Sequence, residues 1–497
     1  MNESTSFNGR FSFGEFNDLS GELFLDGRNT KLDVRHEDFV HHDGGRDPNV
    51  YGILEDHRRV SLIDCISISS TGSTRVNIGG EWQGHSSASI FPHYVIFGEQ
   101  KIDPDETVIS KVRLKTDGEN PALYQPFLFC RAFDSDDLLL QAIGRTAERL
   151  GHAIEPGLHP EMWFFAGHGE NDLGETDMGK LTLLDRYRSS TSSSGISVQN
   201  ERCLQIEFTK PESFHAALQL TLRIIQLFGL LGGAAQALVN MEFDVTSSEG
   251  NKNLRPFDVY LSLPLKNSVG ETARTVHPID VPVRFHDDPE EFRRIVTNWF
   301  STLSTRIEAR NSGANCILHS GTYSAERLVT AANLFDLLPK ECKPQKPQIS
   351  DELKKAKDDA QCFFRSLPES DGREGVLNAL GRIGNPSLRD IISHRAGLIT
   401  AELSQELPEM DLVVRQAVLA RNRYVHGSKG DFDYDKHPGL RIFLIDTLEF
   451  IFLASELVDT GWDIKRWASE IGCATHPLSR YLLGYSENLR ALQQVLV

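Results

Sequence analysis

The chain has 497 residues, of which 39% are hydrophobic and 25% are charged, a composition typical of a globular protein with more than one domain. Its 52 Lys and Arg residues face 70 Asp and Glu residues. The resulting net charge of −18 excludes a protein that coats nucleic acid through bulk positive charge, so any contact with RNA or DNA must be local.

The N-terminus and the apolar segments predict neither export nor a membrane span. Residues 1–16 lack the basic and apolar regions of a signal peptide, and we expect the mature protein to begin at Met1. The most apolar stretch, residues 227–238, is too short to cross a bilayer. The seven cysteines form no C-x-x-C pair, which favours free thiols in a reducing cytoplasm over a disulfide framework or a zinc module.

The beginning of the chain predicts antiparallel β-structure. From Phe11 to about Cys130, short apolar runs alternate with Asp-Gly and Gly-Gly breaks. The runs lie at residues 21–25, 32–34, 61–68 and 94–97. We expect a sandwich or barrel-like sheet within a β-rich N-terminal regulatory or sensor domain over residues 1–205.

The middle of the chain, residues 206–340, predicts a mixed α/β part of the N-terminal region. The expected elements around it are a helix at 136–150, a flexible Ser-rich loop at 189–195, one long helix or two joined at Gly232-Gly233 over 211–240, and a strand at 257–263. Asp288 and Pro289 precede two glutamates, a pattern that predicts a helix start before residues 292–307.

The C-terminal part predicts an all-helical domain. Residues 338–349 contain three prolines and no periodicity, so we expect a linker there and a helical domain over 346–497. The expected helices are 351–367, 373–383, 387–403, 410–426, 439–460, 463–471 and 478–497. Together these parts predict an α+β multidomain chain with a helical bundle at its C-terminus.

The acidity is unevenly distributed. Residues 341–497 hold 20 Lys and Arg against 23 Asp and Glu, a net charge of −3, which leaves −15 for residues 1–340. The helical part can therefore approach a polyanion more easily than the rest of the chain.

One segment of the helical part combines an apolar helix face with a polar end. In Asp411 to Gly427, the side chains of Leu412, Val414, Val418 and Leu419 can pack on neighbouring helices, and Gly427 is a typical helix stop. Arg421, Asn422 and His426 then lie in the last two turns. Because Arg421 and His426 are five residues apart, about 140° on an ideal helix, one chain need not bring both to a single phosphate.

These residue types suit metal-free RNA cleavage. The reaction needs a group that takes the proton from a 2′-hydroxyl, a donor for the leaving 5′-oxygen, and a cation at the pentacoordinate phosphate. Histidine, with an ordinary pKa of about 6.5, can do the first two, and the guanidinium of arginine binds phosphate oxygens bidentately. The spacing alone is not specific, because Arg-x4-His occurs twice, at Arg421/His426 and at Arg389/His394.

Arg421-Asn-Arg-Tyr-Val-His426 in a C-terminal helical domain resembles the R-N-x-x-x-H signature of the HEPN superfamily of ribonucleases. The layout of a β-rich region of about 340 residues before one such domain, with patches such as Tyr51-Gly-Ile-Leu-Glu-Asp, looks like the ApeA-type anti-phage HEPN proteins. The resemblance implies that Arg421 binds the phosphate in the transition state. It also implies that His426 is the acid/base residue and that Asn422 orients or contacts the scissile region.

The resemblance further implies an endoribonuclease that acts in the bacterial cytoplasm without metal or cofactor, as a toxin of abortive infection. HEPN sites are composite across two domains, so a homodimer or larger even oligomer is implied. The expected partners are RNA, with tRNA as the first guess, and a phage-encoded trigger sensed by the N-terminal region. Arg423, Tyr424 and Lys429 are further candidates for RNA contacts.

Other interpretations of the same residues stay open. Arg421, Asn422 and His426 can simply complement the dipole of a helix C-terminus. The helical domain can instead be a catalytically silent dimerisation or RNA-docking module beside a partner-recognition β domain. Gly84 to Ala88 imitates a serine nucleophile turn. Two His/Asp-rich turns, at 36–43 and 286–288, have donor types that bind metals, although such turns are usually just solvated.

Overall fold

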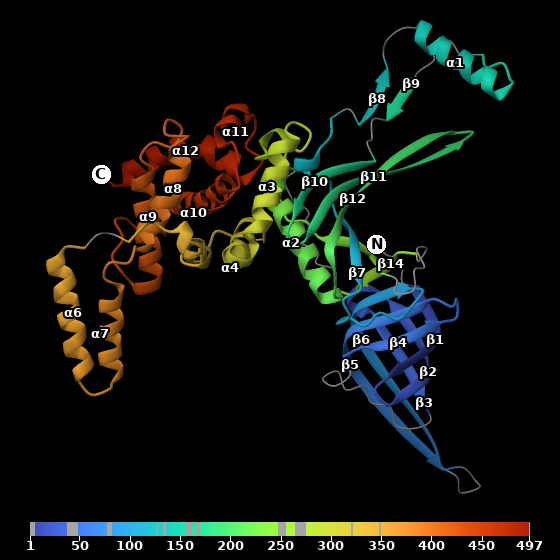
Figure 1. Cartoon of the computed structure of the whole chain (residues 1–497), viewed down its shortest axis with the longest axis horizontal. Coiled ribbons are helices and arrows are strands. Elements are labelled where there is room, and N and C mark those ends of the chain that lie inside the picture. The colour runs from blue at the N-terminus through green and yellow to red at the C-terminus, as the bar shows by residue number, and fades with distance from the viewer. Residues whose placement is uncertain are drawn as a thin grey trace. The chain divides into compact units, whose positions relative to one another are not determined.

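A computed structural model describes residues 5–36, 48–76, 82–126, 128–132, 136–155, 162–165, 169–246, 255–263, 275–319, 322–346 and 349–496. The chain folds into two compact units (Figure 1). The first comprises Met1–Glu119, Leu123–Thr221 and Leu238–Leu265, and the second comprises Asn120–Ala122, Leu222–Ala237 and Lys266–Val497. The β-rich beginning, mixed middle and helical C-terminal region confirm the predicted α+β class.

The first unit begins with a closed antiparallel barrel. Its strands are β1 (Thr5–Phe13), β2 (Phe16–Leu25), β3 (Lys31–His36), β4 (Val50–Leu54), β5 (Arg59–Val76) and β6 (Trp82–Gly98). Their order is β6-β3-β2-β1-β4-β5, and pairing of β5 with β6 closes the ring. The sequence left a sandwich and a barrel open, and the structure decides for the barrel.

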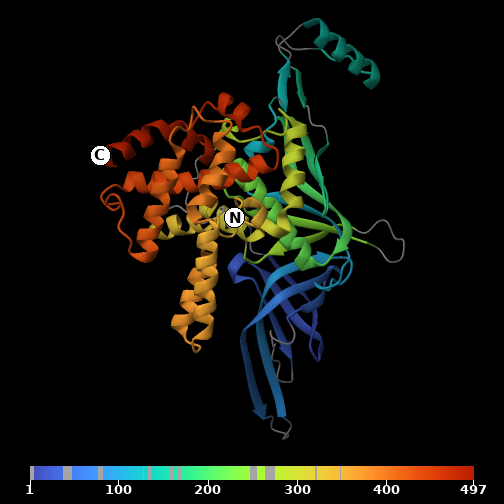
Figure 2. The same cartoon turned by 60° about the vertical axis from the view of Figure 1, so that its left-hand side comes forward.

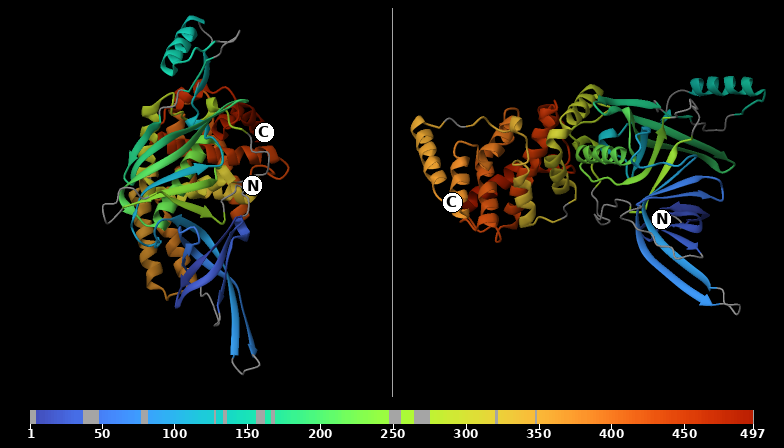
Figure 3. Two further views of the ribbon diagram at one scale, coloured as in Figure 1. Left: turned by 90° about the vertical axis from the view of Figure 1, so that its right-hand side faces the viewer. Right: turned by 60° about the horizontal axis from the view of Figure 1, so that its bottom comes forward.

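The apolar alternation seen in the sequence places one face of each strand inside the barrel. Leu19 and Leu23 of β2 and Leu32 and Val34 of β3 are almost completely buried in this core. A Cβ atom at Gly52 would lie 2.5 Å from the Phe11 ring, so only glycine fits there. Both views in Figure 3 show that β5 and β6 continue as a two-stranded ribbon beyond the other strands of the barrel.

The sheet continues from β6 through six further strands. They are β7 (Ile109–Thr116), β10 (Glu170–Thr176), β11 (Gly179–Ser192), β12 (Gly195–Glu212), β13 (Leu238–Val245) and β14 (Phe257–Leu261). Their order from β6 outward is β14-β13-β7-β12-β11-β10. A separate pair is formed by β8 (Phe129–Ala132) and β9 (Met162–Phe165), and α1 (Asp136–Leu150) lies between them in sequence, as predicted.

Two local predictions for the first unit have clear outcomes. The flexible loop predicted at 189–195 is wrong: Ser189 pairs with Val198 and Ser192 with Gly195, so most of the Ser-rich run is the end of a β-hairpin. Cross-strand hydrogen bonds satisfy the backbone there, which local composition does not reveal. Gly84 to Ala88 lies inside the continuous strand β6, so the strand–turn–helix context of a serine nucleophile is absent from this segment.

The helix predicted over 211–240 is shorter than expected. Strand β12 extends to Glu212, α2 covers Phe214–Gly232, and β13 begins at Leu238. In the described part of the chain, α2 alone is long and apolar enough to cross a membrane, but 61% of its most apolar window is buried inside the protein. Buried core helices pass the same test, so this is weak support for a membrane span.

The second unit is helical. Its helices are α3 (Pro289–Ser301), α4 (Leu303–Ala314), α5 (Ala325–Asn333), α6 (Asp351–Ser366), α7 (Asp371–Arg382), α8 (Leu388–Thr400), α9 (Met410–His426), α10 (Pro438–Asp459), α11 (Ile464–Glu470) and α12 (Pro477–Leu496). Helix α3 begins as predicted, because Asp288 accepts a hydrogen bond from the Glu291 amide and Pro289 follows it. The predicted helix 292–307 is broken at Thr302. Figure 2 shows α6 and α7 as an antiparallel pair.

Buried ion pairs tie the middle of the chain to the C-terminal helices. The Arg327 guanidinium of α5 makes two hydrogen bonds of 2.7 Å to the Glu449 carboxylate of α10. Leu338 and Cys342, inside the predicted linker, are also buried. The compact helical unit therefore includes residues 266–340, which the sequence assigned to the N-terminal region, and the predicted boundaries at 205 and 346 stay predictions.

Helix α12 begins beside a fully buried histidine, His476. His476 Nε2 lies 3.2 Å from the Leu230 carbonyl oxygen, and its Nδ1 accepts a hydrogen bond of 3.1 Å from the Leu478 amide. This pattern suits a neutral ring, because a proton on Nδ1 would face the Leu478 N–H. Burial accordingly lowers the pKa of His476 from 6.5 to about 4.

We expect the second unit to lose stability in mild acid through His476. The pKa of His476 is lower in the folded state than in the unfolded state, so the neutral ring stabilises the fold fully above about pH 6.5. This stabilisation is lost as the pH falls toward 4. At pH 5 the free energy of unfolding is lower by about 2 kcal/mol. Denaturant unfolding at pH 7.5 and pH 5 measures it, with His476→Gln as the comparison. The same pH dependence in both proteins would contradict the expectation.

Candidate functional site

The candidate site lies at the C-terminal end of α9. Val414 and Val418 are buried, as predicted, and Leu412 and Leu419 are half-buried. The helix ends at His426, and Gly427 adopts a φ of 67°, the left-handed conformation typical of a helix stop. The prediction for this helix is confirmed at both ends. Packing of α9 against α5, α8 and α10 fixes the axis of the helix.

The Arg421 guanidinium joins three side chains at this end. Its Nη1 lies 3.2 Å from His426 Nε2 and donates a hydrogen bond of 3.2 Å to Asn422 Oδ1. Its Nη2 donates a hydrogen bond of 3.1 Å to Asn333 Oδ1. A single chain thus brings Arg421 and His426 together despite their 140° separation on the helix, because the long arginine side chain reaches around the last turn.

These contacts differ from those of an ordinary helix cap. Among the residues that the structure describes, the hydrogen bonds of the Arg421 guanidinium run to side chains rather than to the last carbonyl groups of α9. The Arg421–His426 contact requires a neutral His426 with its lone pair on Nε2, since the guanidinium can only donate. That lone pair is what a general base offers to a hydroxyl proton.

The predicted RNA-contacting residues near this cluster differ in their contacts and exposure. The Tyr424 hydroxyl donates a hydrogen bond of 3.2 Å to Asp435 Oδ1, and Arg423 lies over the Tyr434 ring at 5.8 Å. Lys429 is exposed in the segment after the helix. Tyr424 and Arg423 already contact Asp435 and Tyr434, which follow the helix in the chain. Of the three candidates, Lys429 is therefore the best placed to reach a phosphate backbone.

The second Arg-x4-His pair belongs to α8, and its arginine contacts the other end of α9. The Arg389 guanidinium makes a hydrogen bond of 2.8 Å to Asp411 Oδ2, in the first turn of that helix. Asp411 precedes Arg421 by ten residues, about 15 Å of helix. The two Arg-x4-His pairs therefore have different surroundings despite their identical spacing. Arg389/His394 is separate from the Arg421 cluster.

Asn333 also belongs to the site, although the sequence did not indicate it. This residue ends α5, 88 positions before Arg421, in a segment that the sequence assigned to the N-terminal region. No motif contains it, and no periodicity distinguishes it from other asparagines. Only the packing of α5 against α9 reveals the contact.

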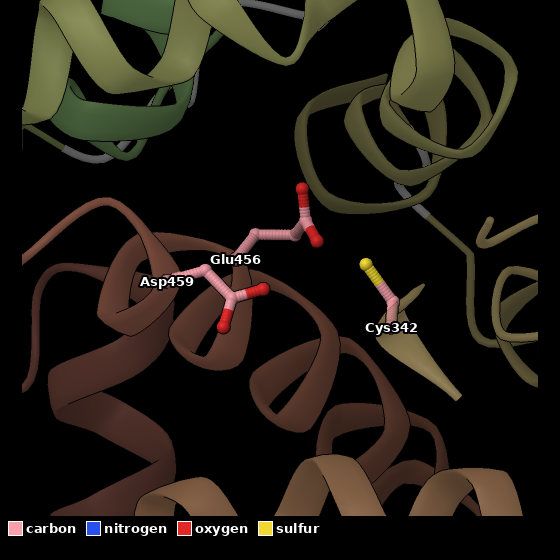
Figure 4. A group of neighbouring side chains, drawn as sticks. All are labelled: Cys342, Glu456 and Asp459. Atoms are coloured by element: carbon pink, nitrogen blue, oxygen red, sulfur yellow. The ribbon is translucent and has the colours of Figure 1, made fainter. Parts of the chain in front are cut away.

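A second polar cluster, which is buried except for Asp459, offers metal-ligand atoms in the helical unit. Cys342 Sγ and carboxylate oxygens of Glu456 and Asp459 lie within 4.8 Å of one another (Figure 4). Arg306, Arg310 and Arg395 bind the two carboxylates. Burial raises the pKa of the Cys342 thiol, against the effect of Arg306 and Arg395, and so keeps it neutral. This arrangement favours an ion-pair network over a metal site.

The two His/Asp-rich turns add no metal site to the described residues. Asp287 pairs with Arg284, and Asp288 caps α3 and pairs with Arg466 at 2.7 Å. In the other turn, His36 ends β3, whereas Glu37, His41, His42 and Asp43 lie outside the described residues.

The barrel, the extended sheet and the helical unit with its Arg–His cluster define a two-part α+β protein. Residues 6–119, which run from β1 to three residues beyond β7, match the family model described as ApeA N-terminal domain 1. This segment therefore carries an ApeA-type N-terminal domain, which agrees with the predicted resemblance, and the domain indicates a role in anti-phage defence. Searches of curated proteins and of solved structures found no match.

Proposed function

We propose that the protein is a metal-independent endoribonuclease of abortive infection, with the end of α9 as its active site. The observation that supports this most directly is the contact between Arg421 and His426, with Asn422 beside it. A phosphate-binding cation and a proton-transfer group stand within one hydrogen bond of each other on an accessible helix end. The ApeA-type domain supplies the biological context.

The chemistry is a transesterification within the RNA. His426 Nε2 takes the proton from a 2′-hydroxyl, and the 2′-oxygen attacks the adjacent phosphorus. Arg421 Nη1 leaves His426 Nε2 for a non-bridging oxygen and stabilises the charge of the pentacoordinate phosphate, while Nη2 keeps its hydrogen bond to Asn333. The bond to the 5′-oxygen breaks, a protonated histidine returns a proton to that oxygen, and a 2′,3′-cyclic phosphate remains.

A second copy of the chain completes the site in this proposal. One histidine cannot be base and acid in the same step unless the proton is shuttled, and two facing α9 ends supply two histidines and two arginines. A homodimer or larger even oligomer is therefore expected, and sedimentation velocity of the purified protein measures it. The N-terminal region then restrains the enzyme or senses a phage-encoded trigger.

RNA can approach the C-terminal part, which contains this site, more easily than the rest of the chain. The C-terminal 157 residues have a net charge of only −3, and Lys429 is exposed beside the cluster. Bulk repulsion of a polyanion is therefore weakest here. We propose tRNA as the first substrate to test, and the bacterial cytoplasm as the place of action.

The experiment that tests the function incubates the purified full chain with total cellular RNA in EDTA. We expect discrete fragments whose 3′ ends carry 2′,3′-cyclic phosphate, and sequencing of those ends identifies the RNA. If the protein cleaves no RNA, the assay is repeated with lysate of phage-infected cells to supply a trigger. Persistent silence, or cleavage that EDTA abolishes, would contradict the proposal.

The alternative is a catalytically silent module for dimerisation or RNA docking. Helices α6 and α7 favour it, because within the described chain they pack on each other but neither contains a buried residue. The two functions differ in the part played by His426. A docking module needs it at most for affinity, whereas the ribonuclease needs it for turnover.

A further inference from the structure

We propose that Asn333 is a positioning residue that holds the Arg421 guanidinium in its catalytic orientation. The inference rests on the proposed ribonuclease function and adds a residue from outside the predicted helical domain to its site. Asn333 Oδ1 accepts a hydrogen bond of 3.1 Å from Arg421 Nη2. Because the guanidinium is planar and rigid, fixing Nη2 also fixes the direction of Nη1, which lies 3.2 Å from His426 Nε2.

The backbone around Asn333 is itself held firmly. Its neighbours Ala332, Leu334 and Phe335 are fully buried, so the end of α5 cannot shift without disturbing the core. Six residues earlier, Arg327 binds the Glu449 carboxylate of α10 with two hydrogen bonds of 2.7 Å. Asn333 is therefore a fixed hydrogen-bond acceptor that orients the flexible side chain of Arg421.

The chemistry of the acceptor matters as much as its place. An amide oxygen orients an arginine without cancelling its charge, so the cation stays available to a phosphate. A carboxylate at the same position would form an ion pair with Arg421 and compete with the substrate. Asparagine thus meets both requirements of a positioning residue, orientation and preserved charge.

The first measurement separates kcat from KM for RNA cleavage by Asn333→Ala, Asn333→Asp and Asn333→Gln. We expect Asn333→Ala to lower kcat roughly 10- to 100-fold with little change in KM, as a small displacement of a catalytic group does. Asn333→Asp should lose more, and Asn333→Gln, which keeps an amide oxygen, should recover part of the loss. A merely structural role would predict equal loss in Ala and Gln together with a lower Tm.

The matched control is Asn385→Ala. Asn385 lies three residues after the end of α7 and donates a hydrogen bond of 3.3 Å to the Gly381 carbonyl, but it belongs to no candidate site. We expect wild-type kinetics from it. If the wild type cleaves RNA and both Asn333→Ala and Asn333→Asp cleave at its rate, Asn333 has no positioning role and the ribonuclease assignment still stands.

The second measurement needs no catalytic activity, so it tests Asn333 even if the ribonuclease proposal fails. Phenylglyoxal modifies free guanidinium groups, and mass spectrometry of the peptide containing Arg421 gives its rate of modification. We expect a several-fold faster rate in Asn333→Ala, a slower rate in Asn333→Asp, and no change in Asn385→Ala. Equal rates in the wild type and all three variants would show that Asn333 does not hold Arg421.

Discussion

We expect His426→Ala to lower the rate of RNA cleavage by roughly 10²- to 10⁴-fold, the range that a positioned proton-transfer group contributes. The imidazole is exposed at the last residue of α9, so its loss opens no cavity and the fold should persist. Arg421→Ala removes the cation at the phosphate and should cost roughly 10²- to 10³-fold. Initial rates on the RNA identified by end sequencing measure both effects.

The chain offers a matched control for these two variants. Arg389 and His394 have the same spacing, but Arg389 pairs with Asp411 at the opposite end of α9. His394→Ala and Arg389→Ala should therefore keep the wild-type rate, and thermal unfolding should show that all four variants fold. A His426→Ala protein that still cleaves at the wild-type rate would refute the assignment, whereas unchanged RNA affinity with lost turnover separates catalysis from docking.

The second large effect is on stability, through Glu456. Its carboxylate is completely buried and accepts hydrogen bonds of 2.8 Å from Arg306 and Arg310 and of 3.2 Å from Arg395. Glu456→Gln keeps the volume but removes the charge, so Asp459 remains as the carboxylate that pairs with Arg306 and Arg395, and Arg310 loses its ion pair with Glu456. We expect the free energy of unfolding to fall by about 3–5 kcal/mol, as when one member of a buried ion pair is removed.

A surface ion pair of the same unit provides the comparison. Glu290 lies 2.5 Å from Arg293 on α3 but is 85% exposed, so Glu290→Gln should change the free energy of unfolding by less than about 1 kcal/mol. Urea denaturation followed by tryptophan fluorescence measures both variants, since Trp299 and Trp467 are buried in the helical unit. Similar small losses in the two proteins would mean that the buried network contributes no more than a surface pair.

Much of the local structure follows from the sequence because its causes are local. The period-two alternation in residues 21–25 and 32–34 becomes β2 and β3, and the stop at Gly427 ends α9 where it was predicted. Asp288 and Pro289 begin α3 through a single side-chain hydrogen bond. Failures occur where pairing across strands overrides composition, as in the hairpin that contains Ser189.

The sequence by itself determined the α+β class, the C-terminal helices and the candidate residues Arg421, Asn422 and His426, because periodicity, caps and a short motif are encoded within a few positions. The tertiary structure decided that the β-region closes into a barrel, that α5 packs on α9, and that Asn333 contacts Arg421. It also decided that Glu456 gathers three arginines from distant segments. Such contacts depend on how helices and strands pack in three dimensions, and residues 88 positions apart leave no common pattern along the chain.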